Sequence, residues 1–368
     1  LLQDSHADLA ITADTRLDLM QAALDESGRD LALYVFENAN PVFPPAPRPV
    51  PNSGPITPET EASLLYTSGT TGRPKGCMLS HGYELEIGEW YMNLGGALDI
   101  EIGKERIYNP LPLFHINAAI CLFFGMVVSG NCHIVPDRFS RTAWWRDIRE
   151  TRATGFHYLG VVIPVLMNEP VAEGERDHKI KFGMGAGVEP SLHRPFEERF
   201  NIPLIEVWGM TEMCRVLADV QEPRKIDTRA MGRPVPGLEV RVVDGEDNDV
   251  PTGVAGELLV RHSAETPRKG FFSGYLNLPE ATEEAWRGGW FHTGDTVSQD
   301  EEGVVYFVDR KKNIIRRSGE NIAAAEIEAC LQAHDDVAQI AVLAIQDEMR
   351  DEEVFAAIVP NGNDRSAE

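Results

Sequence analysis

The segment from Tyr66 to Gly76 combines four Ser or Thr hydroxyls, three glycines and one lysine in eleven residues. Glycines let backbone N–H groups close around an anion, hydroxyls donate to phosphate oxygens, and Lys75 adds a mobile positive charge. Gly76 stands where a Walker A loop needs Ser or Thr for magnesium, so that loop is excluded. Composition alone also fits an ordinary polar loop, but the ordered string favours phosphate binding.

Three other side chains suit a nucleotide and its metal. Glu212 follows Thr211, a pairing that can hold Mg²⁺ and a phosphate oxygen or can be an ordinary solvated pair. Asp295 can accept hydrogen bonds from both hydroxyls of a ribose, although a buried structural Asp is the competing interpretation. Trp208 offers a flat face to adenine or belongs to the core.

Smaller and apolar residues extend this candidate site. Gly185–Gly187 follows the apolar run Phe182–Met184 and lets a purine approach the backbone, although a plain turn fits as well. His115 is interpreted either as a site residue or as a satisfied core histidine. Four residues would wall an apolar pocket or form ordinary core: Phe114, Phe123, Phe124 and Met126.

Four ordered motifs together resemble those of the adenylate-forming superfamily, which comprises acyl-CoA synthetases, peptide-synthetase adenylation domains and firefly-type luciferases. The motifs are Tyr66–Gly76, Trp208–Glu212, Gly289–Asp295 and Tyr306–Glu328. The match runs from about Leu64 to the end of the chain. Within the superfamily the sequence is most similar to crotonobetaine/carnitine-CoA ligases and their bacterial relatives, on the segments Phe307–Arg310, Gly319–Asn321 and Arg350–Glu352.

The resemblance implies a role for each matching residue. It implies catalytic roles for Lys75, Thr211, Glu212 and the hinge residue Lys312, with Glu212 as the metal ligand. It implies ATP or AMP binding by Thr67, Ser68, Gly69, Thr70, Thr71, Gly72, Lys75, Gly185, Ala186, Gly187, Trp208, Gly209, Thr211, Asp295, Phe307 and Arg310. It implies acyl-group or CoA binding by His115, Gly183, Arg316 and Gly319.

The implied activity is ATP-dependent acyl-CoA synthesis with ATP, Mg²⁺ and CoA, in which a carboxylic acid becomes an acyl-adenylate and then a thioester. Two alternatives stay open: an adenylation domain that loads a carrier protein, and a nucleotide-binding protein that has lost turnover. The family's lid lysine, in a Pro-x-x-x-x-Gly-Lys segment, has no match before Glu368, a departure that puts autonomous adenylation in doubt. The aromatic residues near His115 favour a small neutral aliphatic acid, whereas the subfamily resemblance favours a betaine.

Apolar runs that alternate with helical periodicity predict an α/β fold. Residues 8–36 indicate a strand, a helix and a strand, and seven prolines between Pro41 and Pro55 indicate an extended connector and a boundary. Leu238–Val243 and Gly256–Val260 flank turn residues and predict an antiparallel hairpin. Further strands are expected at Leu64–Tyr66, Ile107–Pro110, Cys132–Val135, Gly155–Tyr158, Phe182–Met184 and Leu204–Val207.

We therefore expect a large layered α/β adenylate-forming domain over residues 1–309. Residues 310–368 would form the hinge and the start of a small α+β C-terminal lid domain, with one helix through Ile327 and Leu331 and strands at Ala338–Ile345 and Val354–Val359. Because Leu1 is not an initiator methionine and one helix with two strands buries little apolar area, we expect both domains to continue beyond this sequence.

Charge and cysteine content narrow the class of protein. The chain has 58 acidic and 34 basic residues, a net charge of −24 that opposes a broad grip on nucleic acid or on an anionic membrane. Its five cysteines are scattered, which favours a reducing, cytoplasmic location. The most apolar stretch, Ala118–Val128, is too short for a transmembrane helix and is interpreted as core. The expected partners are a small carboxylic acid, in fatty acid metabolism, and CoA; homo-oligomer formation is left open.

Overall fold

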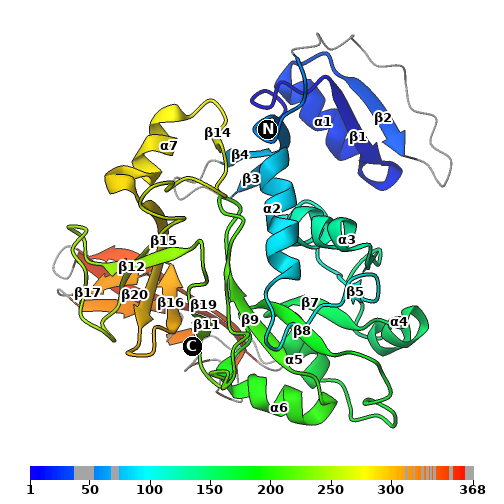
Figure 1. The fold of residues 1–368 in the computed structure, drawn as a ribbon, viewed down its shortest axis with the longest axis vertical. Helices are drawn as coiled ribbons and strands as arrows, with labels where there is room; N and C mark the ends of the chain where they lie inside the picture. The colour runs from blue at the N-terminus through cyan, green and yellow to red at the C-terminus, as the bar shows by residue number, and fades with distance from the viewer. Residues whose placement is uncertain are drawn as a thin grey trace.

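The computed structural model describes residues 1–36, 54–67, 74–310, 314–317, 320–324, 327–328, 331, 334, 337–347 and 351–360. Figure 1 shows the N-terminal unit at one end of the molecule and the C-terminal sheet on the opposite side. None of the helices in this described part of the chain is long and apolar enough to cross a bilayer.

The N-terminal unit is a βαβ element. Strands β1 (Leu9–Ala13) and β2 (Ala32–Phe36) pair in parallel and are joined by a short 3-10 turn and helix α1 (Leu17–Ser27). Gly28 ends the helix in the left-handed conformation, where it closes a hydrogen bond to Leu24. The strand, helix and strand expected over residues 8–36 are confirmed, whereas the proline-rich connector lies in residues 37–53, outside the described residues.

A small antiparallel sheet, in the order β14-β4-β3, follows the connector. It consists of β3 (Glu61–Thr67), β4 (Lys75–Ser80) and the two-residue strand β14 (Gly274–Tyr275). Ser80 caps helix α2 (His81–Met92) by accepting a hydrogen bond from the backbone of Tyr83. The sequence predicted β3 but gave no indication of β14, which pairs with β4 from far along the chain.

The central sheet has six strands in the order β10-β9-β8-β7-β5-β6, parallel except for β10. The strands are β5 (Arg106–Tyr108), β6 (Cys132–Ile134), β7 (Gly155–Leu159), β8 (Phe182–Ala186), β9 (Leu204–Trp208) and β10 (Leu217–Ala218). All five parallel strands lie where the apolar runs predicted them. Parallel strands at the centre of a sheet are largely apolar, which is why these short runs were recognisable.

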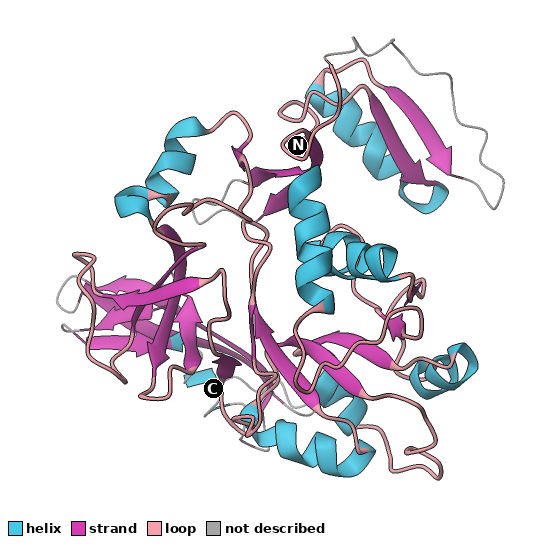
Figure 2. Ribbon diagram, in the orientation of Figure 1, coloured by secondary structure: helices cyan, strands magenta, loops and turns pink. Residues whose placement is uncertain are grey.

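Helices pack around this sheet, as Figure 2 shows. The apolar stretch Ala118–Val128 forms a π-helical turn (Asn117–Leu122) that continues into α3 (Phe123–Ser129). This segment packs on α2 in the larger core, which confirms its interpretation as core. Three further helices, α4 (Trp144–Thr151), α5 (Val162–Met167) and α6 (Pro190–Phe200), share a second core of aromatic and aliphatic residues.

A five-stranded antiparallel sheet, in the order β11-β16-β15-β13-β12, adjoins the central sheet. Its strands are β11 (Ala230–Gly232), β12 (Glu239–Val243), β13 (Gly256–Arg261), β15 (Phe291–Gln299) and β16 (Val305–Arg310). The antiparallel hairpin expected from Leu238–Val243 and Gly256–Val260 is confirmed as β12 and β13. Helix α7 (Pro279–Ala285) and a short 3-10 turn (Arg287–Gly289) connect β14 to β15.

The C-terminal residues form a separate sheet in the order β18-β17-β20-β19. Its strands are β17 (Ile314–Arg317), β18 (Glu320–Ala323), β19 (Val337–Asp347) and β20 (Asp351–Pro360). The two strands expected at Ala338–Ile345 and Val354–Val359 are confirmed as β19 and β20. The short hairpin β17–β18 was not expected, because its polar residues gave no strand pattern. Within the described residues this sheet has a small core of Ile315, Ala324 and Val342.

Candidate active site

The predicted phosphate-binding segment Tyr66–Gly76, called the phosphate-loop segment below, begins in β3 and ends in β4 of one hairpin. Thr67, at the end of β3, lies directly opposite Lys75, at the start of β4. The predicted phosphate ligands Ser68, Gly69, Thr70, Thr71 and Gly72 lie outside the described residues. Thr67 and Lys75, the described residues on either side of this gap, therefore lie next to each other at one end of the paired strands β3 and β4.

Glu212 lies beside this edge and is almost completely buried, with 5% of its surface exposed. The Tyr275 hydroxyl donates to its Oε1 atom at 2.8 Å, and the backbone N–H of Phe272 donates to its carbonyl oxygen at 2.9 Å. Burial raises the pKa of the Glu212 carboxyl, and the hydrogen bond from Tyr275 opposes the rise. The neighbouring Thr211 has its carbonyl oxygen bonded by the Tyr83 hydroxyl at 3.0 Å.

The phosphate-loop lysine faces the same tyrosine. The Lys75 ammonium group lies 4.7 Å from the centre of the Tyr275 ring. Cys77, two residues further along β4, lies opposite Tyr275 in the antiparallel pair. Burial, together with the charge of Glu212, raises the pKa of the Cys77 thiol, so this group is neutral at physiological pH.

The side chains around Glu212 provide only some of the oxygen ligands that Mg²⁺ needs. Mg²⁺ prefers oxygen ligands and usually takes one or two carboxylates together with substrate phosphates and water. Glu212 supplies one carboxylate, and within the described ranges no group of three or more His, Cys, Asp or Glu side chains could hold a metal. A magnesium ion at Glu212 would therefore need phosphate oxygens as further ligands, which the adjoining phosphate-loop hairpin would bring to it.

Trp208 and Asp295 meet at the boundary between the central and the antiparallel sheet. The indole N–H of Trp208 donates to Asp295 Oδ2 at 2.8 Å. Trp208 is buried at the end of β9, and Asp295 lies in β15 opposite Arg310 of β16. The indole thus fixes the orientation of the carboxylate, a contact that the sequence did not indicate.

Two further predicted nucleotide residues flank this contact. Gly209, directly after Trp208, packs so closely on Val216 that a Cβ atom would lie 2.2 Å from its side chain. Phe307 lies in β16 opposite Val297 and donates its backbone N–H to the carbonyl oxygen of Arg229 at 2.9 Å.

The glycine turn after β8 is held by a carboxylate that the sequence analysis missed. Glu206 accepts hydrogen bonds from the backbone N–H groups of Gly187 at 2.8 Å and Val188 at 3.3 Å, and from the Tyr158 hydroxyl at 2.5 Å. Gly187 has φ +84°, and a Cβ atom on Gly160 would lie 2.1 Å from its carbonyl oxygen. Gly185 and Ala186, which precede it in β8, lie beside Tyr158 and Leu159 of β7.

The predicted acyl-site residues are more scattered. His115 is exposed beside Phe114, which is 70% exposed, and their ring centres lie 4.4 Å apart. The alternative of a buried core histidine is therefore wrong. Gly183 is buried in β8, where a Cβ atom would collide with Phe156 and Leu204.

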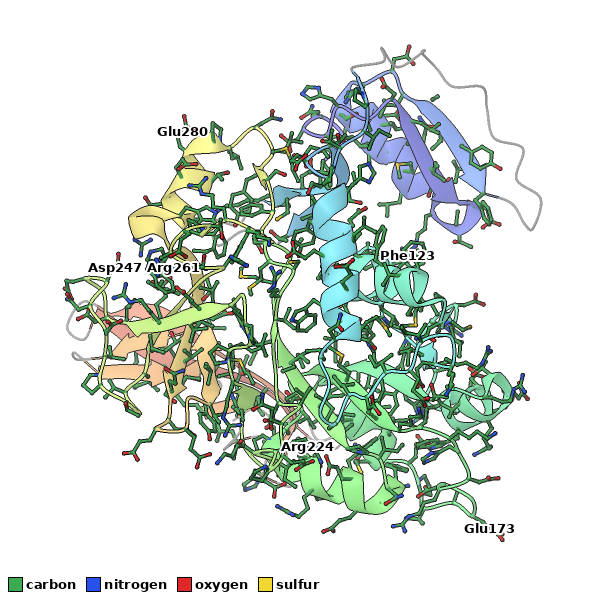
Figure 3. The ribbon with its side chains drawn as sticks, in the orientation of Figure 1. Phe123, Glu173, Arg224, Asp247, Arg261 and Glu280 are labelled. Carbon is green, nitrogen blue, oxygen red and sulfur yellow. The ribbon has the colours of Figure 1, made fainter. Side chains whose placement is uncertain are left out.

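The four apolar residues expected around a pocket do not share one environment. Met126 belongs to the core at 3% exposure, and Phe124 packs against that core. Phe123 is 46% exposed, and Figure 3 places it on α3, on the other side of the molecule from Arg261 in β13. Of the two interpretations, ordinary core holds for Met126 and Phe124, because α3 turns Met126 toward the interior, whereas Phe114 and Phe123 are exposed.

A buried polar network anchors the loop that carries His115. Asn117 Oδ1 accepts from Asn109 Nδ2 at 3.0 Å and lies 2.8 Å from His157 Nδ1. His157 Nε2 lies 3.0 Å from the Tyr91 hydroxyl. The network requires the proton on Nδ1, and burial lowers the pKa of His157 to about 3, so the ring is neutral.

The remaining predicted residues lie at the C-terminal end. Lys312 and Gly319 lie outside the described residues. Arg316 is in β17, opposite Asn321 of β18, and Arg310 ends β16. Sequence reasoning missed Tyr275, which contacts Glu212 and Lys75, and Glu206, which holds Gly187.

The fold of the chain is that of the adenylate-forming enzymes. Family models for an AMP-binding enzyme and for the C-terminal domain of AMP-binding enzymes match residues 1–276 and 326–368. The chain belongs to the AMP-binding enzyme family, which confirms the resemblance seen in the sequence.

Individual relatives agree with this assignment. The chain is 34% identical over 308 residues to a crotonobetaine/carnitine–CoA ligase of Proteus mirabilis, covering 83% of this chain and 58% of the relative. The chain thus spans less than two thirds of that relative's length.

Two solved structures share the fold. The first is o-succinylbenzoate CoA synthetase from Bacillus subtilis in complex with its acyl-adenylate intermediate, at TM-score 0.79, 23% identity and coverage of 99% of this chain and 71% of the other. The second is ATP-bound MatB from Rhodopseudomonas palustris, at TM-score 0.77, 22% identity and coverage of 100% and 71%.

Proposed function

We propose that the protein is an ATP-dependent acyl-CoA synthetase that uses ATP, Mg²⁺ and CoA. The observation that carries the proposal is the arrangement along β9 and the residues after it. This one segment presents Trp208 with Asp295 at one point and Glu212 with Tyr275 and Lys75 at another. This order matches a bound nucleotide, with Trp208 and Asp295 at the base and ribose and with Glu212 and Lys75 at the phosphates.

In the first step a carboxylate oxygen of the acid attacks the α-phosphorus of ATP, and pyrophosphate leaves. Both reactants are anions, so positioning and charge neutralisation dominate the barrier. Bound Mg²⁺ would supply positive charge at the phosphates, with Glu212 as its protein ligand. Lys75 adds a point charge, and Asp295 holds the ribose hydroxyls in the orientation set by Trp208.

In the second step the sulfur of CoA attacks the carbonyl carbon of the acyl-adenylate, and AMP leaves. We propose that residues 310–368 belong to a lid that turns about Lys312 between the two steps, with Arg316 and Gly319 near the CoA path. The C-terminal family match over residues 326–368 supports this division. Gly185–Gly187 and Phe307 would contact the base, and His115 the acyl group or thiol.

The proposed substrate is a small aliphatic carboxylic acid, with a role in fatty acid metabolism. The relatives named crotonobetaine/carnitine–CoA ligases favour a cationic acid of similar size. We propose a cytoplasmic location because four of the cysteines, Cys77, Cys121, Cys132 and Cys214, are free thiols.

The test is a paired assay on the full-length protein. Pyrophosphate release should depend on ATP, Mg²⁺ and an acid, and thioester formation should depend on free CoA. ATP binding without acid-dependent pyrophosphate release would contradict the proposal and favour a nucleotide-binding protein. Thioester formation only on a carrier protein would favour an adenylation domain. Comparing kcat/KM for butyrate-sized acids and for γ-butyrobetaine would decide between the two acid classes.

A further inference from the structure

Tyr275 stands between the two charged groups of the phosphate side of the site. Its hydroxyl bonds Glu212 at 2.8 Å, and its ring lies 4.7 Å from the ammonium group of Lys75. The side chain is buried, and β14 is paired with β4 so that Tyr275 lies opposite Cys77. The residue is therefore fixed against the same strand that begins with Lys75.

The backbone around Tyr275 is also held. Its N–H donates to Thr282 Oγ1 at 2.9 Å, and Thr282 in turn bonds the carbonyl oxygen of Leu278 at 3.0 Å. The ring packs at a T-shaped angle on Phe272, whose N–H binds the backbone of Glu212. The segment from Phe272 to Tyr275 thus contacts Glu212 through both the backbone and the side chain.

The chemistry of a neutral donor matters here. A tyrosine hydroxyl donates one hydrogen bond and fixes the carboxylate without cancelling its charge, whereas an arginine or lysine would form an ion pair. Among the described residues no ion pair joins Lys75 to Glu212, although both flank the same ring. The ring holds the ammonium group by a cation–π contact in place of that ion pair.

We propose that Tyr275 is a positioning residue that orients the Glu212 carboxylate toward Mg²⁺ and keeps Lys75 from pairing with it. This inference rests on the proposed function, because it assigns the cation and the phosphates to Glu212 and Lys75. With Tyr275 in place, the Glu212 carboxylate can bind the metal and the Lys75 ammonium group can bind a phosphate. No sequence motif singled out this residue.

The first test is Tyr275→Phe, which removes the hydroxyl and keeps the ring. We expect the Mg²⁺ concentration that half-saturates ATP binding to rise about tenfold, the usual effect of losing a hydrogen bond to a charged group. ATP binding in the presence of EDTA should stay unchanged, because Lys75 keeps its ring. The measurement is equilibrium titration of full-length protein with ATP at a series of Mg²⁺ concentrations, without turnover.

The second test is Tyr275→Leu, alone and with Lys75→Met. Without the ring, Lys75 is expected to pair with Glu212 and compete with the metal, so Mg²⁺ affinity should fall further than in Tyr275→Phe. Removing the lysine as well should restore part of the Mg²⁺ affinity, by about threefold, because the competing ion pair with Glu212 is then lost. A merely structural role for Tyr275 predicts no such rescue.

Tyr306→Phe is the matched control, because the Tyr306 hydroxyl also donates to a carboxylate, that of Asp300, at 2.8 Å. It should leave Mg²⁺ dependence as in the wild type, and urea unfolding should show that all variants are folded. Wild-type Mg²⁺ dependence in Tyr275→Phe, or no rescue in the double variant, overturns the inference alone. Absence of Mg²⁺-dependent ATP binding in the wild-type protein overturns the proposed function and this inference together.

Discussion

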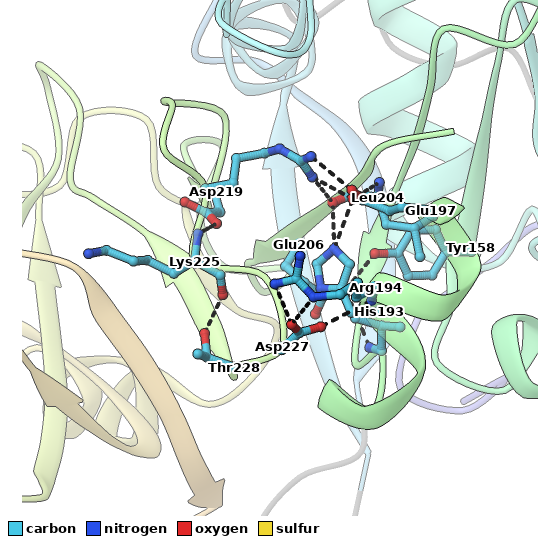
Figure 4. Close-up of polar contacts among 12 residues, drawn as sticks. Tyr158, His193, Arg194, Glu197, Leu204, Glu206, Asp219, Lys225, Asp227 and Thr228 are labelled. Atoms are coloured by element: carbon cyan, nitrogen blue, oxygen red, sulfur yellow. Dashed lines mark hydrogen bonds and ion pairs between the residues drawn. The ribbon is translucent and has the colours of Figure 1, made fainter. Parts of the chain in front are cut away.

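Glu197 and Glu212 precede and follow β9 in the sequence, the first partly buried and the second buried, and their surroundings are opposite. Glu197, on α6, accepts from Arg224 at 2.7 Å, from the backbone of Leu204 at 2.8 Å, and lies 3.2 Å from His193 Nε2 (Figure 4). Burial alone would raise its pKa, but the hydrogen bonds from His193 and Arg224 lower it to about 2. Glu212 has a neutral hydroxyl as its side-chain donor, and burial raises its pKa.

The difference shows how one fold uses buried charge in two ways. The charge of Glu197 is balanced by Arg224 inside the protein, so removing a partner should cost stability. Glu212 is oriented by a neutral hydroxyl and makes no ion pair among the described residues, so under the proposed function a bound Mg²⁺ would supply the balancing charge. The two regions should therefore separate in experiments: variants near Glu197 should affect folding, and variants near Glu212 should affect adenylate formation.

The largest expected effect is that of Glu212→Gln on the first half-reaction. Loss of the carboxylate charge should lower the rate of Mg²⁺-dependent pyrophosphate release on the order of a thousandfold, since several kcal/mol of charge stabilisation is lost. The matched variant Lys75→Ala should be milder, because lysine acts as one point charge among several donors. A larger loss in Lys75→Ala, or unchanged adenylate formation in Glu212→Gln, would contradict this ranking.

Arg224→Ala should have the largest effect on folding. It leaves Glu197 buried with fewer donors, and we expect the free energy of unfolding to fall by about 3 kcal/mol. Urea unfolding measures this, with Arg194→Ala as the control, because the ion pair between Arg194 and Asp227 is exposed (Figure 4) and should contribute at most about 0.5 kcal/mol. Equal losses in the two variants would remove the distinction between the regions.

Acid should weaken the central sheet through His157. An unfolded histidine takes up a proton near pH 6.5, whereas burial lowers the pKa of His157 to about 3 in the folded protein. Below pH 6.5 the unfolded state therefore binds more protons, and stability is lost as the pH falls toward 3. Between pH 6.5 and 5 the free energy of unfolding should fall by about 2 kcal/mol. Well above pH 6.5, His157 no longer makes the free energy of unfolding depend on pH.

The measurement is the free energy of unfolding at pH 7.5, 6.5 and 5.0 for wild type and for His157→Gln. The variant should be less stable at neutral pH and should lose less stability on acidification. His6→Gln, at an exposed position, should keep the wild-type dependence. An unchanged slope in His157→Gln would show that another group is responsible.

The smallest expected effect is that of Trp208→Phe, which keeps an aromatic face and removes the N–H that bonds Asp295. We expect ATP affinity to fall about fivefold, because the hydrogen bond that orients Asp295 contributes roughly 1 kcal/mol to the free energy of binding. The preference for ATP over 2′-deoxy-ATP should also fall, because the ribose carboxylate is less fixed. Trp145→Phe, in α4, is the control. If Trp208→Phe keeps the full preference for ATP over 2′-deoxy-ATP, the indole of Trp208 contributes only by packing.

The strands and motifs that could be predicted from the sequence are those whose residues lie next to one another in the chain. Leu204–Val207 is apolar at three of its four positions and became β9, and Glu212 follows it in a recognisable order of residue types. Tyr275 could not be predicted, since β14 has two residues and its contact with Glu212 joins positions 63 apart. The contact between His157 and Asn117 likewise spans 40 positions. Such contacts arise from the packing of the sheets and leave no periodicity in the sequence.

The register of β3 and β4 has a consequence for the closure of the phosphate-loop segment. Thr67 and Lys75 are paired across the two strands, so the ladder of the hairpin already brings the two ends of this segment together. Loop-closure entropy grows only slowly with length, by about 0.6 kcal/mol for each doubling. Under the proposed function, the pairing of the two strands would therefore carry most of the cost of bringing together the two ends of the phosphate-loop segment.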